Sequence, residues 1–225
     1  MGSVEQAPFN LTEVDRQVLA QTDEEFQYHD WADLQDIVAR NDLGALRRKP
    51  SDLRRYISWT NSIKADYGSI TNYVCQRRLG WLEPNPASQS DNSNTVPFRN
   101  EIPFADPEDY KILRNDWPYG VTPDITHLVV WTKTPIPVKA ENGDLTDESR
   151  ALIDDFVTRT FVQRLQSDSR FQGKSLDDLR RQHVLWFKNW TALQSVRSVE
   201  HFHVLLKDVP DDLIVEWTQE KDIVR

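Results

Sequence analysis

Two histidines separated by a single residue give this sequence its clearest candidate for chemistry. They are His201 and His203, in the segment Glu200-His201-Phe202-His203-Val204. On a β-strand alternate side chains leave the same face, so the two imidazoles would lie about 6 to 7 Å apart. Because histidine titrates near neutral pH, the pair suits a general base beside an acid, or two metal ligands. Hydrogen-bonded histidines without a chemical role are the alternative.

A third histidine and an acidic, aromatic segment could share that face. His127 begins another predicted strand, and Asp116 lies beside Trp117 and Tyr119 in the segment Asn115-Asp116-Trp117-Pro118-Tyr119-Gly120. A carboxylate among aromatic rings can form a pocket wall that favours cations. The three histidines with Asp116 could also form a metal shell, but no spacing such as His-Glu-x-x-His supports one, and no metal is predicted.

Two tryptophans flank a lysine in a third predicted strand, residues 184–190. Trp186, Lys188 and Trp190 alternate there with Phe187 and Asn189. A cation between two indoles could stack a base or an aromatic side chain while Lys188 contacts a phosphate or a carbonyl group. Half-buried packing of the tryptophans explains the same pattern, so both interpretations stay open.

The sequence signals for residues that could contact an oxyanion, and for residues that could act as nucleophiles, are weaker. Lys133 follows the strand that His127 begins and is a candidate contact for an oxyanion or a phosphate. Ser69 follows Gly68 at a predicted helix break, where its hydroxyl could meet free backbone N–H groups, although an N-cap serine is the favoured interpretation. Arg197, in the loop before the histidine strand, is a candidate substrate contact.

The elements that would hold these residues are helices in the first half of the chain and strands in the second. Capping residues and apolar spacings of three and four predict helices that begin at Thr12, Asp30, Ser51, Ser69, Thr146 and Ser175. Period-two alternation predicts strands at residues 126–132, 184–190 and 200–206. Prolines between residues 96 and 125 predict an irregular, extended segment.

This order predicts an α+β fold in which a helical N-terminal half packs on a small, mostly antiparallel β-sheet. Residues 30–225 are expected to form a single α+β domain, preceded by an N-terminal helical extension at residues 1–29. The stretch 84–95, rich in Pro, Asn, Ser and Asp, is predicted to be a surface loop rather than a domain boundary.

Composition limits the classes of protein to which the chain can belong. Its 225 residues include 8 Trp, 9 Phe and 6 Tyr, too much aromatic surface for a disordered chain. A single cysteine permits no internal disulfide. No apolar run approaches the roughly 20 residues that span a bilayer, and the N-terminus lacks the features of a secretory signal. A soluble, cytoplasmic protein without a membrane partner is expected.

The net charge argues against a protein that coats nucleic acid through charge alone. It is −9, from 27 basic and 36 acidic residues, whereas such binding depends on neutralising phosphates. A local basic patch is still compatible with this charge, although runs of charge also form ordinary solvated helix ends. The candidates for such a patch are Arg47, Arg48, Lys49, Arg54, Arg55, Arg77 and Arg78.

Several blocks of residues occur in a recognisable order along the chain. They are Tyr67-Gly68-Ser69, Arg78-Leu79-Gly80-Trp81 and residues 115–120, 127–133, 186–190 and 200–204. Together they resemble the fungal N-acetylglucosamine-induced protein family, which is catalogued as a domain of unknown function. The resemblance extends from about Trp31 to Leu206, which is nearly the whole chain.

Some members of that family are arginine-containing cyclodipeptide synthases, so the resemblance implies this activity as the leading expectation. Such enzymes take aminoacyl groups from two charged tRNAs and release a cyclic arginine-Xaa dipeptide. The implied partners are arginyl-tRNA and a second aminoacyl-tRNA. No cofactor is expected, because the tRNA ester is already activated.

The candidate residues can be assigned roles in that chemistry. His201 or His203, with His127 nearby, would be the base, and Lys188, Asn189 or Lys133 would hold the oxyanion. Asp116 or Glu200 would pair with the arginine guanidinium. The aromatic residues that would line the second side-chain pocket are Trp117, Tyr119, Trp186 and Trp190, and the basic residues would contact tRNA.

Two other classes of function stay open at this stage. The family name points to an amino-sugar response, which suggests a sugar-nucleotide-binding regulator or a hydrolase that uses His201 and His203. A non-enzymatic interaction module, with the aromatic faces as partner sites, is the third possibility.

Overall fold

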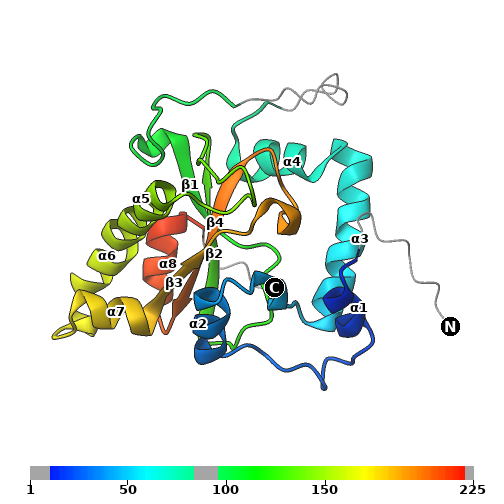
Figure 1. The fold of residues 1–225 in the computed structure, drawn as a ribbon, viewed down its shortest axis with the longest axis horizontal. Coiled ribbons are helices and arrows are strands. Elements are labelled where there is room, and N and C mark those ends of the chain that lie inside the picture. Colours follow the sequence, from blue (N-terminus) through cyan, green and yellow to red (C-terminus); the bar gives the residue numbers. More distant parts are fainter. Residues whose placement is uncertain (1–10, 84–95, 221–225) are drawn as a thin grey trace.

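The sheet that carries the histidines has four strands, and each neighbouring pair is antiparallel. The computed structural model describes residues 11–83 and 96–220. The strands are β1 (Tyr110–Arg114), β2 (Ile125–Thr132), β3 (Val184–Phe187) and β4 (Glu200–Lys207). Their order across the sheet is β1-β2-β4-β3, so the long strands β2 and β4 form its centre (Figure 1).

The register of β2 against β4 brings the three histidines to one face. Val129 lies opposite His203, Trp131 lies opposite His201, and His127 is diagonal to His203. Successive residues of a strand face opposite sides of a sheet, and residues two apart share a side, so the three imidazoles lie on the same side. The predicted antiparallel pairing of the last two strands is also confirmed.

Helices from the second half of the chain cover the opposite face of the sheet (Figure 1). They are α5 (Asp147–Val157), α6 (Gln163–Gln166), α7 (Leu176–His183) and α8 (Asp211–Thr218). Leu128 and Phe202 of the sheet pack with Phe156 and Phe161 in one fully buried cluster. The helix predicted from Thr146 is present as α5 and α6, joined through a wider turn at residues 158–162.

The N-terminal helices lie on the histidine side. They are α1 (Glu13–Leu19), α2 (Trp31–Ala39), α3 (Pro50–Tyr67) and α4 (Ile70–Tyr73), which continues into a wide turn at Val74–Leu79. α2 packs Leu34 and Ile37 against Phe187 of β3 and Leu205 of β4. The predicted α+β class is therefore confirmed, with the sheet between two sets of helices (Figure 1).

The helix caps predicted from the sequence hold at all but one position. They are confirmed at Thr12, Asp30, Ser69, Thr146 and Ser175, and Gly68 separates α3 from α4 with a φ of 74°. The predicted cap at Ser51 is wrong, because α3 already begins at Pro50. The backbone N–H of Ser51 instead donates to Oδ1 of Asp23 at 2.8 Å.

Three elements differ from the prediction. β1 lies inside the segment 96–125 that was predicted to be irregular, because pairing with β2 along its whole length organises five residues between prolines. β3 ends at Phe187 instead of continuing to Trp190. α8, which follows Pro210, was not predicted. The predicted loop at 84–95 lies outside the described residues.

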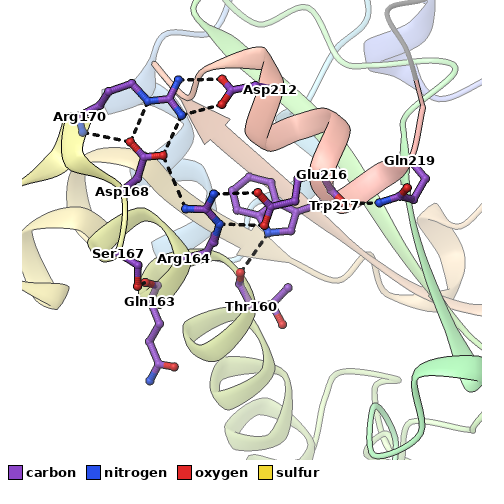
Figure 2. Close-up of polar contacts among 10 residues, drawn as sticks. All are labelled: Thr160, Gln163, Arg164, Ser167, Asp168, Arg170, Asp212, Glu216, Trp217 and Gln219. Atoms are coloured by element: carbon purple, nitrogen blue, oxygen red, sulfur yellow. Dashed lines mark hydrogen bonds and ion pairs between the residues drawn. The ribbon is translucent and has the colours of Figure 1, made fainter.

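Ion pairs fasten α8 to α6 and to the turn after it (Figure 2). Arg164 binds Glu216 through two hydrogen bonds of 2.8 Å. Arg170 lies between Asp168 and Asp212, and each carboxylate receives contacts of 2.7 or 2.8 Å. This docking matters for the site, because the carboxylate of Glu220 just after α8 binds Arg78.

Removing Arg170 should loosen α8 at neutral pH. Arg170 holds the pKa of Asp168 and of Asp212 below the ordinary range. The stability that these two ion pairs contribute is therefore present above about pH 4 and is lost as the pH falls through the lowered pKa values. For Arg170→Gln we expect faster amide hydrogen exchange in residues 211–218 at pH 7 and a smaller difference from wild type in acid. Arg16→Gln, which breaks an exposed pair with Glu13, is the control, and unchanged exchange in Arg170→Gln would contradict this docking role.

Gly120 marks a close backbone approach beside the acidic aromatic segment. Its N–H donates to the carbonyl of Arg47 at 2.7 Å, and a Cβ at this position would lie 2.4 Å from the ring of Phe26. We expect Gly120→Ala to lower the free energy of unfolding by about 1 to 3 kcal/mol, because the ring or the loop must shift. Urea denaturation measures the change. Gly44→Ala, whose Cβ would have no atom within 4 Å, is the control, and equal losses in the two variants would refute the steric explanation.

Candidate functional site

A cavity of about 120 Å³ lies between the histidine face of the sheet and the helices α3 and α4. We call it the histidine cavity. Polar residues in its wall include His201, His203, Asn189 and Asp116, and aromatic residues in its wall are Tyr56, Trp59, Trp117, Tyr119 and Trp131. The structure therefore brings the β4 histidines together with the acidic aromatic segment, although more than 80 residues separate them in the sequence.

His203 is the centre of a hydrogen-bonded chain. Its Nδ1 lies 3.0 Å from Nε2 of His127, and its Nε2 lies 3.2 Å from Nδ2 of Asn189. The amide of Asn189 also donates to the hydroxyl of Tyr119 at 3.2 Å. Phe187 stacks on the His203 ring with 4.9 Å between centroids. Both nitrogens of His203 are therefore engaged, and its ring is held in place.

His201 has a defined tautomer and one free nitrogen. Its Nδ1 lies 2.9 Å from the carbonyl oxygen of Val199, so this nitrogen carries the hydrogen and donates it. The lone pair is then on Nε2, for which the described part of the chain supplies no hydrogen-bond partner. Trp131 stacks on the ring at 4.5 Å between centroids. Of the two β4 histidines, His201 is the one whose geometry leaves a nitrogen able to accept a proton.

Burial keeps all three imidazoles uncharged. It lowers the pKa of His127 to about 3 and the pKa of His201 to about 4, and it lowers the pKa of His203 well below the usual value. The positive charges of Arg48 and Lys188 act in the same direction. The expectation that these rings titrate near neutral pH is therefore wrong, because desolvation disfavours the imidazolium form.

Two arginines hold the acidic aromatic segment at the cavity. Arg78 donates from Nε to Oδ2 of Asp116 and from Nη1 to Oε1 of Glu220, both at 2.8 Å. Arg48 donates from Nε to the carbonyl of Trp117 at 3.2 Å. Consecutive residues of the segment thus anchor two guanidinium groups, and both arginines lie in the cavity wall rather than in an open basic patch.

A second cavity, of about 320 Å³, adjoins the first and shares Asp116 and Tyr119 with it. We call it the acidic cavity, because its wall adds Asp52 of α3 to Asp116. Arg114 also lines it and is paired with Asp211. His127 belongs to this second wall, so its hydrogen bond to His203 connects the linings of the two cavities.

The predicted face of Trp186, Lys188 and Trp190 does not form, because β3 ends at Phe187. Trp186 points to the opposite face of the sheet, where its Nε1–H donates to Oδ1 of Asp154 at 3.1 Å. Trp190 packs in the cluster around α2. The packing alternative for these tryptophans is therefore the one that the structure shows.

Other predicted site residues also lie away from the two cavities. Glu200 lies two residues before Phe202 and shares its face of the sheet, away from the histidines, and it pairs with Lys188 at 3.1 Å. Lys133 lies over the ring of Trp81 at 5.4 Å. The hydroxyl of Ser69 accepts the backbone N–H of Asn72 at 3.1 Å, which is the capping role that the sequence favoured.

The candidate basic patch is divided among local partners. Lys49 pairs with Asp23, and Arg55 pairs with Asp52. Arg54 donates to the carbonyl of Leu19, and Arg47 lies over the ring of Phe26. Of the seven residues named as candidates for the patch, Arg54, Arg55 and Arg77 are exposed.

Sequence reasoning missed four residues of this region. Tyr56 and Trp59 come from α3, where their spacing of three residues indicates a shared helix face and was the available signal. Asp52 and Glu220 had none, because each reaches the site from an element whose position depends on the tertiary fold. Asp52 therefore adds to the wall of the acidic cavity, and Glu220 binds Arg78, which lines the histidine cavity.

The metal shell considered from the sequence is not assembled in the part of the chain that the structure describes. Within residues 11–83 and 96–220, no group of three His, Cys, Asp or Glu side chains is placed to hold a metal ion. In the same residues, no helix combines the length and the apolar character needed to cross a bilayer.

Replacing one buried imidazole should flatten the acid dependence of stability. The pKa of His127 is about 3 in the folded protein and near 6.5 in an unfolded chain. Above pH 6.5 this ring therefore does not lower the free energy of unfolding. As the pH falls from 6.5 toward 3 the free energy of unfolding decreases, because the unfolded chain binds the proton first. We expect the free energy of unfolding to fall less between pH 7 and pH 4 in His127→Gln than in wild type, as measured by urea denaturation. Equal slopes would show that the ring is protonated in the folded state.

Comparisons with known proteins find relatives over most of the chain. The chain is 33% identical over 193 residues to N-acetylglucosamine-induced protein 1 of Candida albicans, which covers 83% of this chain and 71% of that protein. It is 28% identical over 184 residues to the uncharacterized protein YPL067C of Saccharomyces cerevisiae, with 81% of each chain covered. A solved structure described as the crystal structure of HTC1 matches with a TM-score of 0.55 and 25% identity, covering 86% of this chain and 92% of that one.

A family model gives the same assignment. The model described as a protein of unknown function, DUF3605, matches residues 30–207. That range contains the strands of the sheet and all three site histidines. The chain therefore belongs to the DUF3605 family, and it is distantly related to the N-acetylglucosamine-induced protein of Candida.

Proposed function

We propose that this protein is an aminoacyl-tRNA-dependent cyclodipeptide synthase that joins arginine to a second amino acid. The observation that carries the proposal is the uncharged His201, which has a free Nε2 among the described residues and lines a cavity that adjoins an acidic one. A reaction between two aminoacyl groups needs an unprotonated base and space for two different side chains. The two adjoining cavities supply both requirements.

The proposed reaction consists of two aminolysis steps. The α-amine of one aminoacyl group attacks the ester carbonyl of the other, so that a C–N bond forms, the ester C–O bond breaks and one tRNA leaves. The proton lost by the amine passes to Nε2 of His201 and then to the departing ribose oxygen. The second amine attacks the remaining ester in the same way, which closes the ring and releases the second tRNA.

Two buried donors support stabilisation of the oxyanion. Nε1 of Trp117 and Nη2 of Arg78 are buried without a hydrogen-bond partner among the described residues, and both side chains line the histidine cavity. Donors in such a site stabilise the negative charge that develops on the carbonyl oxygen. We assign them the role that the sequence had suggested for Lys188, Asn189 or Lys133.

The acidic cavity suits the arginine side chain. Asp52 and Asp116 both line it and are paired with Arg55 and Arg78. Because a carboxylate has about four acceptor sites, each could also accept hydrogen bonds from a bound guanidinium group. Tyr56 and Trp59 in the histidine cavity offer apolar surface to the second side chain. The exposed cations Arg54, Arg55 and Arg77 are the proposed contacts for tRNA phosphates.

Product formation tests the proposal directly. The purified protein is incubated with arginyl-tRNA and a mixture of other charged tRNAs, and the products are analysed by mass spectrometry. We expect a cyclic dipeptide that contains arginine, and no such product when arginyl-tRNA is omitted. Absence of the product from the complete mixture, with charged tRNA verified at the end of the reaction, would refute the proposal.

Substitutions at the base and at the acidic cavity should have different effects. His201→Gln should lower turnover by about 100-fold or more, because the proton acceptor is lost. Asp52→Asn should raise the KM for arginyl-tRNA about tenfold with a smaller effect on kcat, because one charged hydrogen bond is lost. Ser69→Ala, which removes a helix cap, and Asp36→Asn on α2 are the controls. Loss of turnover in Ser69→Ala with an unchanged melting temperature would instead indicate a covalent aminoacyl-serine.

A sugar-nucleotide-binding role is the second candidate. The name of the Candida relative refers to induction by N-acetylglucosamine, and Arg48 of this chain forms no ion pair within the described residues. Stabilisation of the protein by a sugar nucleotide, without cyclic dipeptide formation, would favour this second role.

A further inference from the structure

A third cavity lies between α1, α3 and the loop at residues 192–197. At about 450 Å³ it is larger than the histidine cavity and the acidic cavity. We call it the basic cavity. Its charged lining consists of Arg48, Lys64, Arg197 and Asp15. The carboxylate of Asp15 is already bound by the N–H and hydroxyl of Thr12 in a helix cap. The cavity therefore presents more positive than negative charge, in a protein whose net charge is −9.

Arg48 presents an oriented guanidinium group to this cavity. Its guanidinium lies 4.5 Å from the ring centroid of Tyr56 and 5.2 Å from that of Tyr119, and its Nε donates to the carbonyl of Trp117. No carboxylate of the described residues lies within ion-pair distance of it. The aromatic rings fix the guanidinium plane while its other N–H groups stay available, which is the arrangement in which arginine binds phosphate.

The same arginine connects the basic cavity to the histidine cavity. Arg48, Tyr56, Tyr119 and Ser195 line both of them, so a ligand anchored at Arg48 can extend toward His201. The rest of the lining combines apolar residues, among them Leu43, Leu46 and Leu53, with the polar side chains of Thr12, Thr60 and Gln194. A volume of this size, with both cationic and apolar residues in its wall, matches the usual dimensions of a small-molecule site.

From this arrangement we infer that the basic cavity binds a phosphorylated nucleoside, with the phosphate on Arg48 and Arg197 and the base against the leucine side chains. Two sources can supply this chemistry: the terminal nucleotide of a tRNA and a free nucleotide. Identification with the tRNA end rests on the proposed function, whereas the binding of the nucleotide does not.

Isothermal titration calorimetry with adenosine 5′-monophosphate, adenosine and inorganic phosphate tests the inference. We expect the monophosphate to bind more tightly than either fragment and its affinity to fall with added salt. Arg48→Gln and Arg197→Gln should each weaken it about tenfold, because each removes a charged hydrogen bond. Arg40→Gln, which removes an exposed positive charge on α2 outside the cavity, should leave the affinity unchanged. Melting temperatures show whether each variant is folded, and the Arg197 variant keeps the test valid if Arg48 is also needed for packing.

The outcomes separate this inference from the proposed function. Absence of binding by the wild-type protein, or equal affinity in Arg40→Gln and both cavity variants, would overturn the inference even if cyclic dipeptide forms. Binding without cyclic dipeptide would uphold the inference and refute the proposed function. Competition identifies the source: displacement of the monophosphate by tRNA with an intact 3′ end, and not by tRNA lacking its terminal adenosine, indicates the tRNA end, whereas tighter binding of a sugar nucleotide indicates a free nucleotide.

Discussion

The antiparallel pairing of β2 with β4 is the constraint on which the candidate site depends. It places Val129 against His203 and Trp131 against His201, and it brings His127 within hydrogen-bond distance of His203. A shift of one residue in either strand would turn its histidines to the opposite face. That face packs against α5 and α6 in a dry core, where unpaired imidazoles would be strongly destabilising. Burial of Leu128 and Phe202 in this core therefore stabilises the strand register that the site requires.

Desolvation gives the three imidazoles different chemical properties from those of exposed histidines. All of them are uncharged at neutral pH, but the nitrogens of His127 and His203 form hydrogen bonds with each other and with neighbouring side-chain amides. His201 donates through Nδ1 and keeps Nε2 free within the described residues. A set of rings that looks equivalent in the sequence is thus divided into a hydrogen-bonded pair and one ring whose Nε2 has no partner within the described residues. The pair also links the linings of two cavities of unlike charge.

Two arginines make the acidic aromatic segment part of the site. Arg78 bridges Asp116 and Glu220, so it joins the segment to the residues that follow α8. Arg48 binds the next residue, Trp117, and lies in the walls of both the histidine and the basic cavities. The ion pairs between α6 and α8 (Figure 2) support this arrangement from the other side of the sheet. The positions of the site side chains therefore depend on contacts between the two halves of the chain.

Local sequence was sufficient for the elements whose signals are local. Helix caps at Thr12 and Thr146, the break at Gly68 and the alternation of His201 and His203 each depend on a few neighbouring residues, and each was predicted. Family membership was also readable from the order of the blocks of residues that carry the resemblance, and the α+β class followed from the order of the elements. The tertiary structure alone decided that β1 forms between prolines, that β3 stops at Phe187 and that Trp186 and Glu200 face away from the histidines. It also decided which basic residues enter a cavity wall, and it lowered the pKa of each imidazole. The physical reason is that strand pairing, desolvation and ion pairing depend on groups brought together from distant parts of the chain, which no local pattern of residues can specify.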